Sequence, residues 1–414
     1  MKTILVHLPA YREPELVPTI KDAIAKATHP DRIHFGICRQ YHPDDGFDNV
    51  DAFKDRKGFK VMDVYFEDAK GLPWARARIN EDLLDDEDYV LQLDSHHRFA
   101  ENWDEIIIGL HDGLKAKGVE KPLIGGYLPQ YEPTTDPIGR ADCPWQAQFA
   151  CFYPHGTIFI RPGGLPNWQN LKEPPPARFL SGHFCFGESQ WARDVLHDPD
   201  IFFSGEELNL SVRSYTHGYD IFHCHKLIIW HATMRTERDG ILVWDDKNKK
   251  GEDWWAIQTQ ARAKIRQLLY NEDNGFDIKP EYGLGTERTV EEYEQFAGIK
   301  FKDKQVQQYT ADNLYPPNPI DSEWKASFYH LVNITRNDLP GDDYISILIA
   351  FDDKDGTGVH TRNIEGPELD SFMKGNTIHY EEFFLHDANR TPVRMVAWAV
   401  SKDKGWAERI ERTI

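Results

Sequence analysis

The chain has 414 residues, and its 48 lysines and arginines stand against 68 aspartates and glutamates, which gives a formal net charge of −20. This length predicts two or three domains with sizeable cores. The acidity argues against a protein that wraps nucleic acid by bulk electrostatics, because phosphate binding needs a basic face. An aromatic content of 13% excludes general disorder and favours pockets for flat ligands such as sugars.

Membrane attachment and disulfide bonding are not expected. No apolar run approaches the ~20 residues of a membrane span, and the first residues lack an apolar signal core. The five cysteines are odd in number and widely spaced, and no C-x-x-C pair occurs, so neither a disulfide framework nor a cysteine zinc site is predicted. We therefore expect a protein of the reducing cytoplasm.

Residues 1–130 alternate short apolar runs with amphipathic stretches, the pattern of a parallel sheet covered by helices. The predicted strands span residues 3–8, 33–38, 60–66, 89–94 and 123–128. Helices are predicted at 16–27, 74–84 and 102–117. This order of elements favours an α/β fold of the nucleotide-binding type.

The pattern changes twice further along the chain. Residues 130–176 are rich in proline, glycine and aromatic residues and are predicted to form a long functional loop. Helices at 205–217, 254–270 and 289–296 and strands at 219–222 and 226–230 follow. Strand-like segments at 326–334, 344–351 and 393–400 predict a small all-β sandwich. We expect an α/β domain over 1–275, a connecting segment over 276–320 and the β domain over 321–414.

The segment YVLQLDSHHRFAENWDE, residues 89–105, is the most informative. An apolar strand delivers Asp94 to the carboxyl end of the sheet, where open α/β folds bind ligands, and Ser95, His96 and His97 follow. Asp94 and His96 can present an oxygen and a nitrogen to one Mn²⁺ or Mg²⁺ ion that also binds diphosphate oxygens. In the alternative interpretation, Asp94 only caps the turn and both histidines are solvated.

Several motifs in the same order resemble the polypeptide α-N-acetylglucosaminyltransferases of the cytoplasm and their bacterial and viral relatives. The motifs are ILVHLPAYREPEL, RIHFGICRQ, GLPWARARIN and DEDYVLQLDSHHRFAENWDE, then FFSGEELNLSVRSYTHGYDIF at 202–222, the Trp230-His231 pair and, weakly, RTVEEYEQFAG at 288–298. The resemblance covers about residues 3–300. In that family, D-S-H replaces the D-x-D of glycosyltransferase-A folds.

The resemblance implies a glycosyltransferase-A fold and a retaining transfer of a sugar, N-acetylglucosamine, from a UDP-sugar to a hydroxyl. Glucose, galactose or a pentose are alternative donor sugars. Asp94 and His96 match the family's metal motif, and His231 matches a later histidine that completes such a site. His231 is alternatively a core histidine at a strand end.

The donor nucleotide is expected to lie against the loops that follow the first, second and fourth strands. The residues implied are Pro9, Ala10, Tyr11, Arg12, Gln40, Asp94 and Ser95, with Arg76 pairing with the diphosphate through its planar guanidinium. Alternatively, Tyr11 covers the sheet edge, and Arg76 pairs with Glu81 or Asp82 on its own helix.

The segment Ser204-Gly205-Glu206-Glu207 permits two interpretations. S-x-x-E before an apolar helix is a capping box, in which Ser204 and Glu207 bond each other's amides. The resemblance instead places Glu206 at the substrate and leaves Glu207 shared between the two roles. Asp220 either orients sugar hydroxyls or forms a structural salt bridge. His223 and His225 are not favoured as metal ligands, because no second ligand pair is nearby.

The acceptor side is predicted from aromatic residues at 145–168 and 179–191, the second range containing Ser181-Gly182-His183. A protein side-chain hydroxyl is the acceptor that the resemblance favours. Two alternatives stay open: transfer to hydroxymethylated bases of DNA, and a carbohydrate-binding protein without catalysis.

Overall fold

The computed structural model describes residues 1–233, 241–375 and 377–414. They form two compact units: Met1–Gln148, Ile160–Ala297 and Tyr315–Pro317 make up the first, and Phe149–Phe159, Gly298–Leu314 and Asn318–Ile414 the second. The predicted connecting segment 276–320 is divided between these units, and the boundaries at 275 and 320 stay predictions. Among the described residues, no helix combines the length and the apolar character that a membrane crossing requires.

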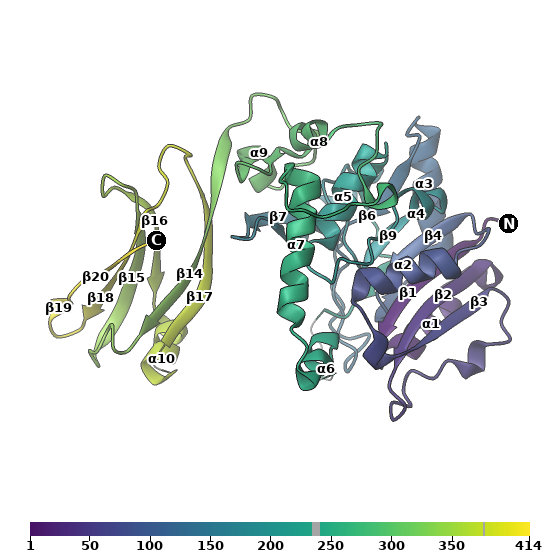
Figure 1. Ribbon diagram of the computed structural model, residues 1–414, viewed down its shortest axis with the longest axis horizontal. Coiled ribbons are helices and arrows are strands. Elements are labelled where there is room, and N and C mark those ends of the chain that lie inside the picture. The colour runs from purple at the N-terminus through teal and green to yellow at the C-terminus, as the bar shows by residue number, and fades with distance from the viewer. Residues whose placement is uncertain (234–240, 376) are drawn as a thin grey trace. The chain divides into compact units, whose positions relative to one another are not determined.

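The first unit is built on a seven-stranded sheet with the order β10-β6-β9-β4-β1-β2-β3 (Figure 1). Its strands are β1 (Ile4–Tyr11), β2 (Ile33–Tyr41), β3 (Phe59–Tyr65), β4 (Tyr89–Leu93), β6 (Pro122–Gly125), β9 (Phe184–Glu188) and β10 (Asp220–His223). The five strands predicted in the first 130 residues are present. They run parallel to one another, as expected, and a later strand, β9, lies antiparallel between β4 and β6.

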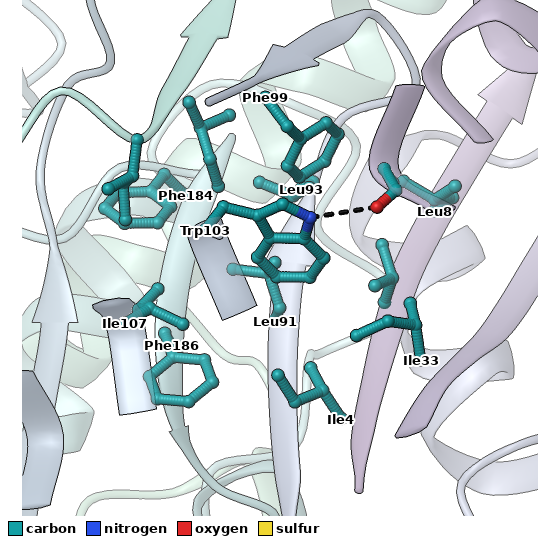
Figure 2. Packing of buried hydrophobic residues seen from close by; sticks show 14 of the residues in the cluster. Ile4, Leu8, Ile33, Leu91, Leu93, Phe99, Trp103, Ile107, Phe184 and Phe186 are labelled. Atoms are coloured by element: carbon teal, nitrogen blue, oxygen red, sulfur yellow. Dashed lines mark hydrogen bonds between the residues drawn. The ribbon is translucent and has the colours of Figure 1, made fainter. Parts of the chain in front are cut away.

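Helices cover both faces of this sheet. The helices α1 (Leu16–Lys26) and α3 (Trp103–Ala116) share one apolar core with the sheet, whereas α2 (Leu72–Asp82), α4 (Gln190–Asp194) and α5 (Glu206–Thr216) pack on the other face. Figure 2 shows Trp103 of α3 packed among Leu91, Leu93 and Phe99, and its indole N–H donates to the Ala23 carbonyl at 2.9 Å. This bond satisfies the one polar atom of a fully buried side chain.

Several further elements were not predicted. The strand β5 (His97–Phe99) was missed, and it pairs with β11 (Ile229–His231), which overlaps the strand predicted at 226–230. The strand β7 (Trp145–Phe152) pairs with β8 (Ile158–Gly164) inside the expected loop. The helix α6 (Val243–Lys250) was also missed, whereas α7 (Trp254–Tyr270) begins and ends where predicted, and α8 (Val290–Ala297) lies within one residue of its prediction.

The second unit contains two antiparallel sheets that share a core, as the sandwich prediction requires. One sheet holds β12 (Ile299–Lys300), β13 (Gln305–Gln307), β14 (Trp324–Thr335) and β17 (Thr377–His386). The other holds β15 (Tyr344–Asp352), β16 (Gly358–Ile364), β18 (Arg394–Ser401), β19 (Gly405–Trp406) and β20 (Ile410–Thr413). Val332 of β14 and Ile349 of β15 lie in the same buried cluster. The unit is not purely β, because it includes α9 (Gln308–Ala311) and α10 (Gly366–Gly375).

Candidate functional site

The carboxyl end of β4 and a short strand pair assemble the candidate site. Asp94 directly follows β4, and β5 begins three residues later at His97. The strand β5 pairs antiparallel with β11, with His97 opposite His231, and the amide of Ala232 donates to the His96 carbonyl at 3.2 Å. This pairing brings a histidine from late in the sequence to the edge where Asp94 lies.

Asp94, His96 and His231 form the group predicted to bind metal. Their ligand atoms all lie within 4.8 Å of one another. Nε2 of His231 is 3.4 Å from Oδ2 of Asp94 and 3.0 Å from Nε2 of His96, and the His96 Nε2 is 3.8 Å from the same oxygen. Two imidazole nitrogens and one carboxylate oxygen form a donor set that suits divalent transition metals and leaves further coordination positions open. The residues therefore fit a metal ion.

Hydrogen bonds behind the ligands fix their orientation. Nδ1 of His96 lies 3.2 Å from Oε2 of Glu13, and Nδ1 of His231 lies 3.3 Å from Oγ1 of Thr233. Burial by itself would raise the pKa of Asp94, but the hydrogen bond to His231 and the charge of Arg76 outweigh it and hold that pKa well below its ordinary value. Asp94 is thus ionised and ready to bind a cation.

Two further imidazoles pack against this group as neutral rings. The ring of His183 stacks on that of His231 with a centroid distance of 4.3 Å, and His97 lies 5.0 Å from His231. Burial lowers the pKa of both rings well below the ordinary value, and the neighbouring charge of His231 adds to this effect. His183 also accepts the amide N–H of Leu128. It supports the site from behind rather than forming the predicted acceptor surface.

Arg76 does not play its predicted part at a diphosphate, nor does it pair with Glu81 or Asp82. Its side chain is fully buried and donates to Asp94 and Glu206, each at 2.7 Å. The neighbouring Arg78 makes the surface pair with Asp82 instead. Because α2 turns Arg76 toward the sheet, the guanidinium orients Asp94 and has no exposed surface left for substrate.

Glu206 is buried and Glu207 is half-buried, and neither lines the cavity described below. The N-cap of α5 is Gly205 in a left-handed conformation, with φ of 97°, so the capping-box interpretation is wrong. Glu207 accepts the backbone N–H of Gly182 at 3.0 Å, which ties α5 to the segment before β9. Glu206 reaches Asp94 only through Arg76, and the structure does not place it at a substrate.

A cavity of about 350 Å³ opens beside the three metal-group residues. This volume lies within the range of roughly 300–1,000 Å³ that is typical of small-molecule sites. Its walls include the predicted residues Pro9, Tyr11, Gln40, Asp94, Ser95, His96 and His231. Residues that the sequence did not single out also line it, namely Glu13, Gly71, Leu72, Phe203, Ala232, Thr233, Leu242, Val243 and Trp244.

Two residues at the end of β1 that were predicted to contact the nucleotide make other contacts in the structure. Ala10 is fully buried in the core, and Arg12, with a positive φ of 45°, pairs with Asp45 at 2.7 Å and with Asp246 at 2.8 Å. The Tyr11 hydroxyl donates to the same Asp246 at 2.8 Å. The loop after β1 is therefore joined to α6, whose Val243 and Trp244 face the cavity.

Asp220 lies away from this site. It begins β10, which runs parallel to β6, so it lies at the amino edge of the sheet, opposite the edge that carries Asp94. Its carboxylate pairs with Arg288 at 2.9 Å, which is the salt-bridge alternative. Within residues 1–233, 241–375 and 377–414, Asp94, His96 and His231 form the only metal-type cluster of three, so His223 and His225 belong to none.

Part of the predicted acceptor surface is interior instead. Residues 184–188 form β9, an interior strand of the sheet, and Phe179, Phe184, Phe186 and Trp191 are at most 1% exposed. Besides Tyr11, the cavity wall includes Phe203 and Trp244, whose ring centroids are 5.6 Å apart. No spacing rule singles these two out, because the helix that carries Trp244 was not predicted.

Comparison with known proteins gives one family match. A family model described as Glycosyltransferase (GlcNAc) matches residues 3–57 and 47–303. No curated protein matches the chain at a significant level.

Two solved proteins are similar in structure at low sequence identity. GalNAc-T7, crystallised with UDP, GalNAc and Mn²⁺, is 14% identical with a TM-score of 0.48, over 65% of this chain and 49% of its own. The chain thus spans about half the length of GalNAc-T7. S. aureus TarS 1–349 in complex with UDP-GlcNAc is 16% identical with a TM-score of 0.37, over 68% of this chain and 77% of its own.

Proposed function

The chain belongs to the GlcNAc glycosyltransferase family, and from this premise we propose that it is a metal-dependent enzyme that moves a sugar from a UDP-sugar to a hydroxyl. N-acetylglucosamine is the proposed sugar, since the family is described by it. The observation that carries the proposal is the meeting of Asp94, His96 and His231 at the wall of a cavity large enough for a small ligand.

The donor set favours Mn²⁺ over Mg²⁺, because two of the three ligand atoms are imidazole nitrogens, whereas Mg²⁺ prefers oxygen. When bound, such an ion supplies Lewis-acid stabilisation of the charge on a leaving diphosphate. The low pKa of Asp94 keeps its carboxylate ionised for this role, and the ion pair with Arg76 fixes the orientation of that carboxylate. Arg76 can do this without touching the substrate.

The walls of the cavity supply binding surface for the donor. Tyr11, Phe203 and Trp244 offer aromatic faces on which a base or a sugar ring can stack, and Gln40 offers a side-chain amide for hydrogen bonds. Pro9 and Ser95 complete the floor between β1 and the metal group. We assign the nucleotide to this cavity.

We infer that the transfer retains the configuration of the sugar. The acceptor oxygen bonds to the anomeric carbon on the face from which the diphosphate leaves, and the acceptor's proton passes to that diphosphate. Two nearby glutamates could otherwise act as a base or a nucleophile, but both already have partners. Glu206 pairs with Arg76, and Glu207 accepts the backbone N–H of Gly182, which supports the inference. Product analysis by NMR of the anomeric proton tests it.

The proposed acceptor is a protein side-chain hydroxyl in a reducing compartment. All five cysteines are unpaired, which is usual where disulfides do not form. The net charge of −20 disfavours a DNA acceptor, because duplex DNA would be repelled. A gel shift with duplex DNA at low salt tests this choice, and a specific shift would favour a modified base instead.

The decisive experiment measures thermal stabilisation by UDP-sugars with and without Mn²⁺, followed by UDP release. A ligand that binds the native state raises the melting temperature by mass action, so the donor is identified without knowledge of the acceptor. Asp94→Asn should abolish both metal-dependent stabilisation and UDP release, whereas Asp220→Asn on the opposite sheet edge should retain them. A carbohydrate-binding protein without catalysis would release no UDP, and full activity of Asp94→Asn would contradict the metal site.

A further inference from the structure

We propose that Glu13 is a positioning residue that orients the His96 ring for metal binding, an inference that rests on the proposed metal-dependent function. Glu13 lies in the turn between β1 and α1, and its side chain is 1% exposed. Its Oε2 lies 3.2 Å from Nδ1 of His96. The family resemblance implied roles for residues 9–12 only, so Glu13 was not among the predicted site residues.

The Glu13 carboxylate is itself held in place. Its Oε1 accepts the backbone N–H of Glu15 at 2.9 Å, while the other oxygen faces His96. A carboxylate with one oxygen tied to the backbone has little freedom to turn away. The hydrogen bond to His96 is therefore a fixed feature of the turn rather than a surface contact.

This contact determines which nitrogen of His96 faces the metal group. A carboxylate only accepts hydrogen bonds, so Nδ1 of His96 is the donor, and in the neutral ring that a metal ion binds, Nε2 carries the lone pair. Nε2 is the atom that lies 3.8 Å from Oδ2 of Asp94 and 3.0 Å from Nε2 of His231. A carboxylate behind a metal-binding imidazole fixes the tautomer and increases the basicity of the ligand.

His231 has a weaker support of the same kind. The group at its Nδ1 is the Thr233 hydroxyl at 3.3 Å, which can donate or accept and so does not determine the tautomer. We therefore assign the larger share of the orienting effect to Glu13. Because Glu13 also lines the cavity, a direct contact with the donor must be separated from this role.

The test measures the affinity for Mn²⁺ alone, without nucleotide, by the EPR signal of free Mn²⁺. Glu13→Gln should weaken binding about 10- to 100-fold, the usual effect of removing such a partner. Glu15→Gln is the matched control, because it removes the same charge two residues away, where the carboxylate pairs with Arg98 at 2.6 Å. The control should bind Mn²⁺ within about twofold of the unchanged protein.

Glu13→Asp separates orientation from charge. It keeps the negative charge but shortens the side chain by one methylene, which breaks the contact to Nδ1. A loss of Mn²⁺ affinity similar to that of Glu13→Gln supports positioning, whereas full affinity of Glu13→Asp would overturn it and leave only an electrostatic effect. This variant also carries the test if Glu13→Gln does not fold, as judged by its thermal unfolding.

A second measurement reads the tautomer directly in the metal-free protein. Long-range ¹H–¹⁵N spectra, with the His96 signals assigned by their loss in His96→Asn, should show the proton on Nδ1 in the unchanged protein and a changed population in Glu13→Gln. If the unchanged protein and both Glu13 variants bound Mn²⁺ equally well, this inference would be overturned, but the proposed function would not. Failure of the unchanged protein to bind Mn²⁺ would overturn the proposed function and the inference with it.

Discussion

The guanidinium of Arg76 is the one cation in direct contact with both Asp94 and Glu206 in the described ion pairs, and its side chain is fully buried. Arg76→Met leaves the buried Glu206 and the partly exposed Asp94 without this partner, so we expect it to lower the free energy of unfolding by about 3 kcal/mol. Urea denaturation of the metal-free protein measures the loss.

Arg78 provides the control on the same helix. Its side chain is 41% exposed and pairs with Asp82 on the surface, so Arg78→Met should cost no more than about 1 kcal/mol. Equal losses for the two variants would contradict the distinction between a buried and an exposed pair. The sequence places both arginines on one helix, but it does not say which of them turns toward the sheet.

Glu207 makes stability depend on pH. Burial raises its pKa from the ordinary 4.5 to about 7, although the Gly182 N–H acts in the opposite direction. Between these values the folded state holds a proton that the unfolded state has lost, so stability falls as the pH rises through this window. The loss is on the order of 3 kcal/mol and is complete above about pH 7.

Glu207→Gln should remove this dependence, because the amide keeps an acceptor for Gly182 and carries no charge. Urea unfolding of the metal-free protein between about pH 4.5 and 8 measures the difference between variant and unchanged protein, which should grow with pH. Glu291→Gln, at an exposed position on α8, serves as the control and should follow the unchanged protein. If the difference in the free energy of unfolding stayed constant with pH, it would contradict the raised pKa of Glu207.

Most elements near the site follow from local patterns, and the exceptions have physical reasons. The alternation of apolar runs and amphipathic helices predicted β1 to β4, α1 to α3 and α7. The strand β9 was missed because FCFGE is nearly buried throughout and shows no period, and its antiparallel place between β4 and β6 depends on long-range pairing. The strand β5 was missed because it has only three residues, too few to show a period.

The site residues also fall into two groups, those predicted from local sequence and those brought in by long-range contacts. Asp94 and His96 are neighbours in sequence and were predicted from their position after an apolar strand, whereas His231 depended on resemblance alone. Glu13 and Trp244 reach the site only through the packing of a turn and of α6. Contacts of this kind carry no local pattern, because they are set by where the whole chain brings the elements together.

The helix α6 contributes to the wall of the cavity that we propose for the donor, and one of its carboxylates ties it to the end of β1. Asp246 accepts hydrogen bonds from the Tyr11 hydroxyl and from Arg12, each at 2.8 Å, while Val243 and Trp244 line the cavity. Asp246→Ala releases this contact, so we expect UDP binding in the presence of Mn²⁺ to weaken about tenfold, the value of a charge-assisted hydrogen bond. Calorimetric titration with UDP measures the change.

Two observations make this prediction specific to the contact between α6 and the loop. Asn248 lies on the same helix with an exposed side chain, so Asn248→Ala should bind UDP as the unchanged protein does. Asp94 and His96 lie between β4 and β5, and His231 is on β11, so Asp246→Ala should keep its affinity for Mn²⁺ alone. Loss of Mn²⁺ binding in this variant would mean that α6 supports the metal group as well.

At the scale of the whole molecule, the two units have separate hydrophobic cores. Ile37 on β2 belongs to the core of the first unit, and Ile349 on β15 belongs to that of the second, and both are fully buried. Proteins with more than one core often unfold in more than one step. The residues proposed to bind metal and donor all come from the first unit.

We expect the cores to respond separately to truncation. Ile349→Ala should lower the stability of the second unit by about 2–5 kcal/mol, because it removes buried methyl groups and leaves a cavity, and it should leave the affinity for Mn²⁺ unchanged. Ile37→Ala should lower the other calorimetric transition by a similar amount. Differential scanning calorimetry with and without Mn²⁺ checks both, since the metal should shift only the transition that Ile37→Ala lowers. A shift of both transitions by either substitution would show that the cores unfold as one.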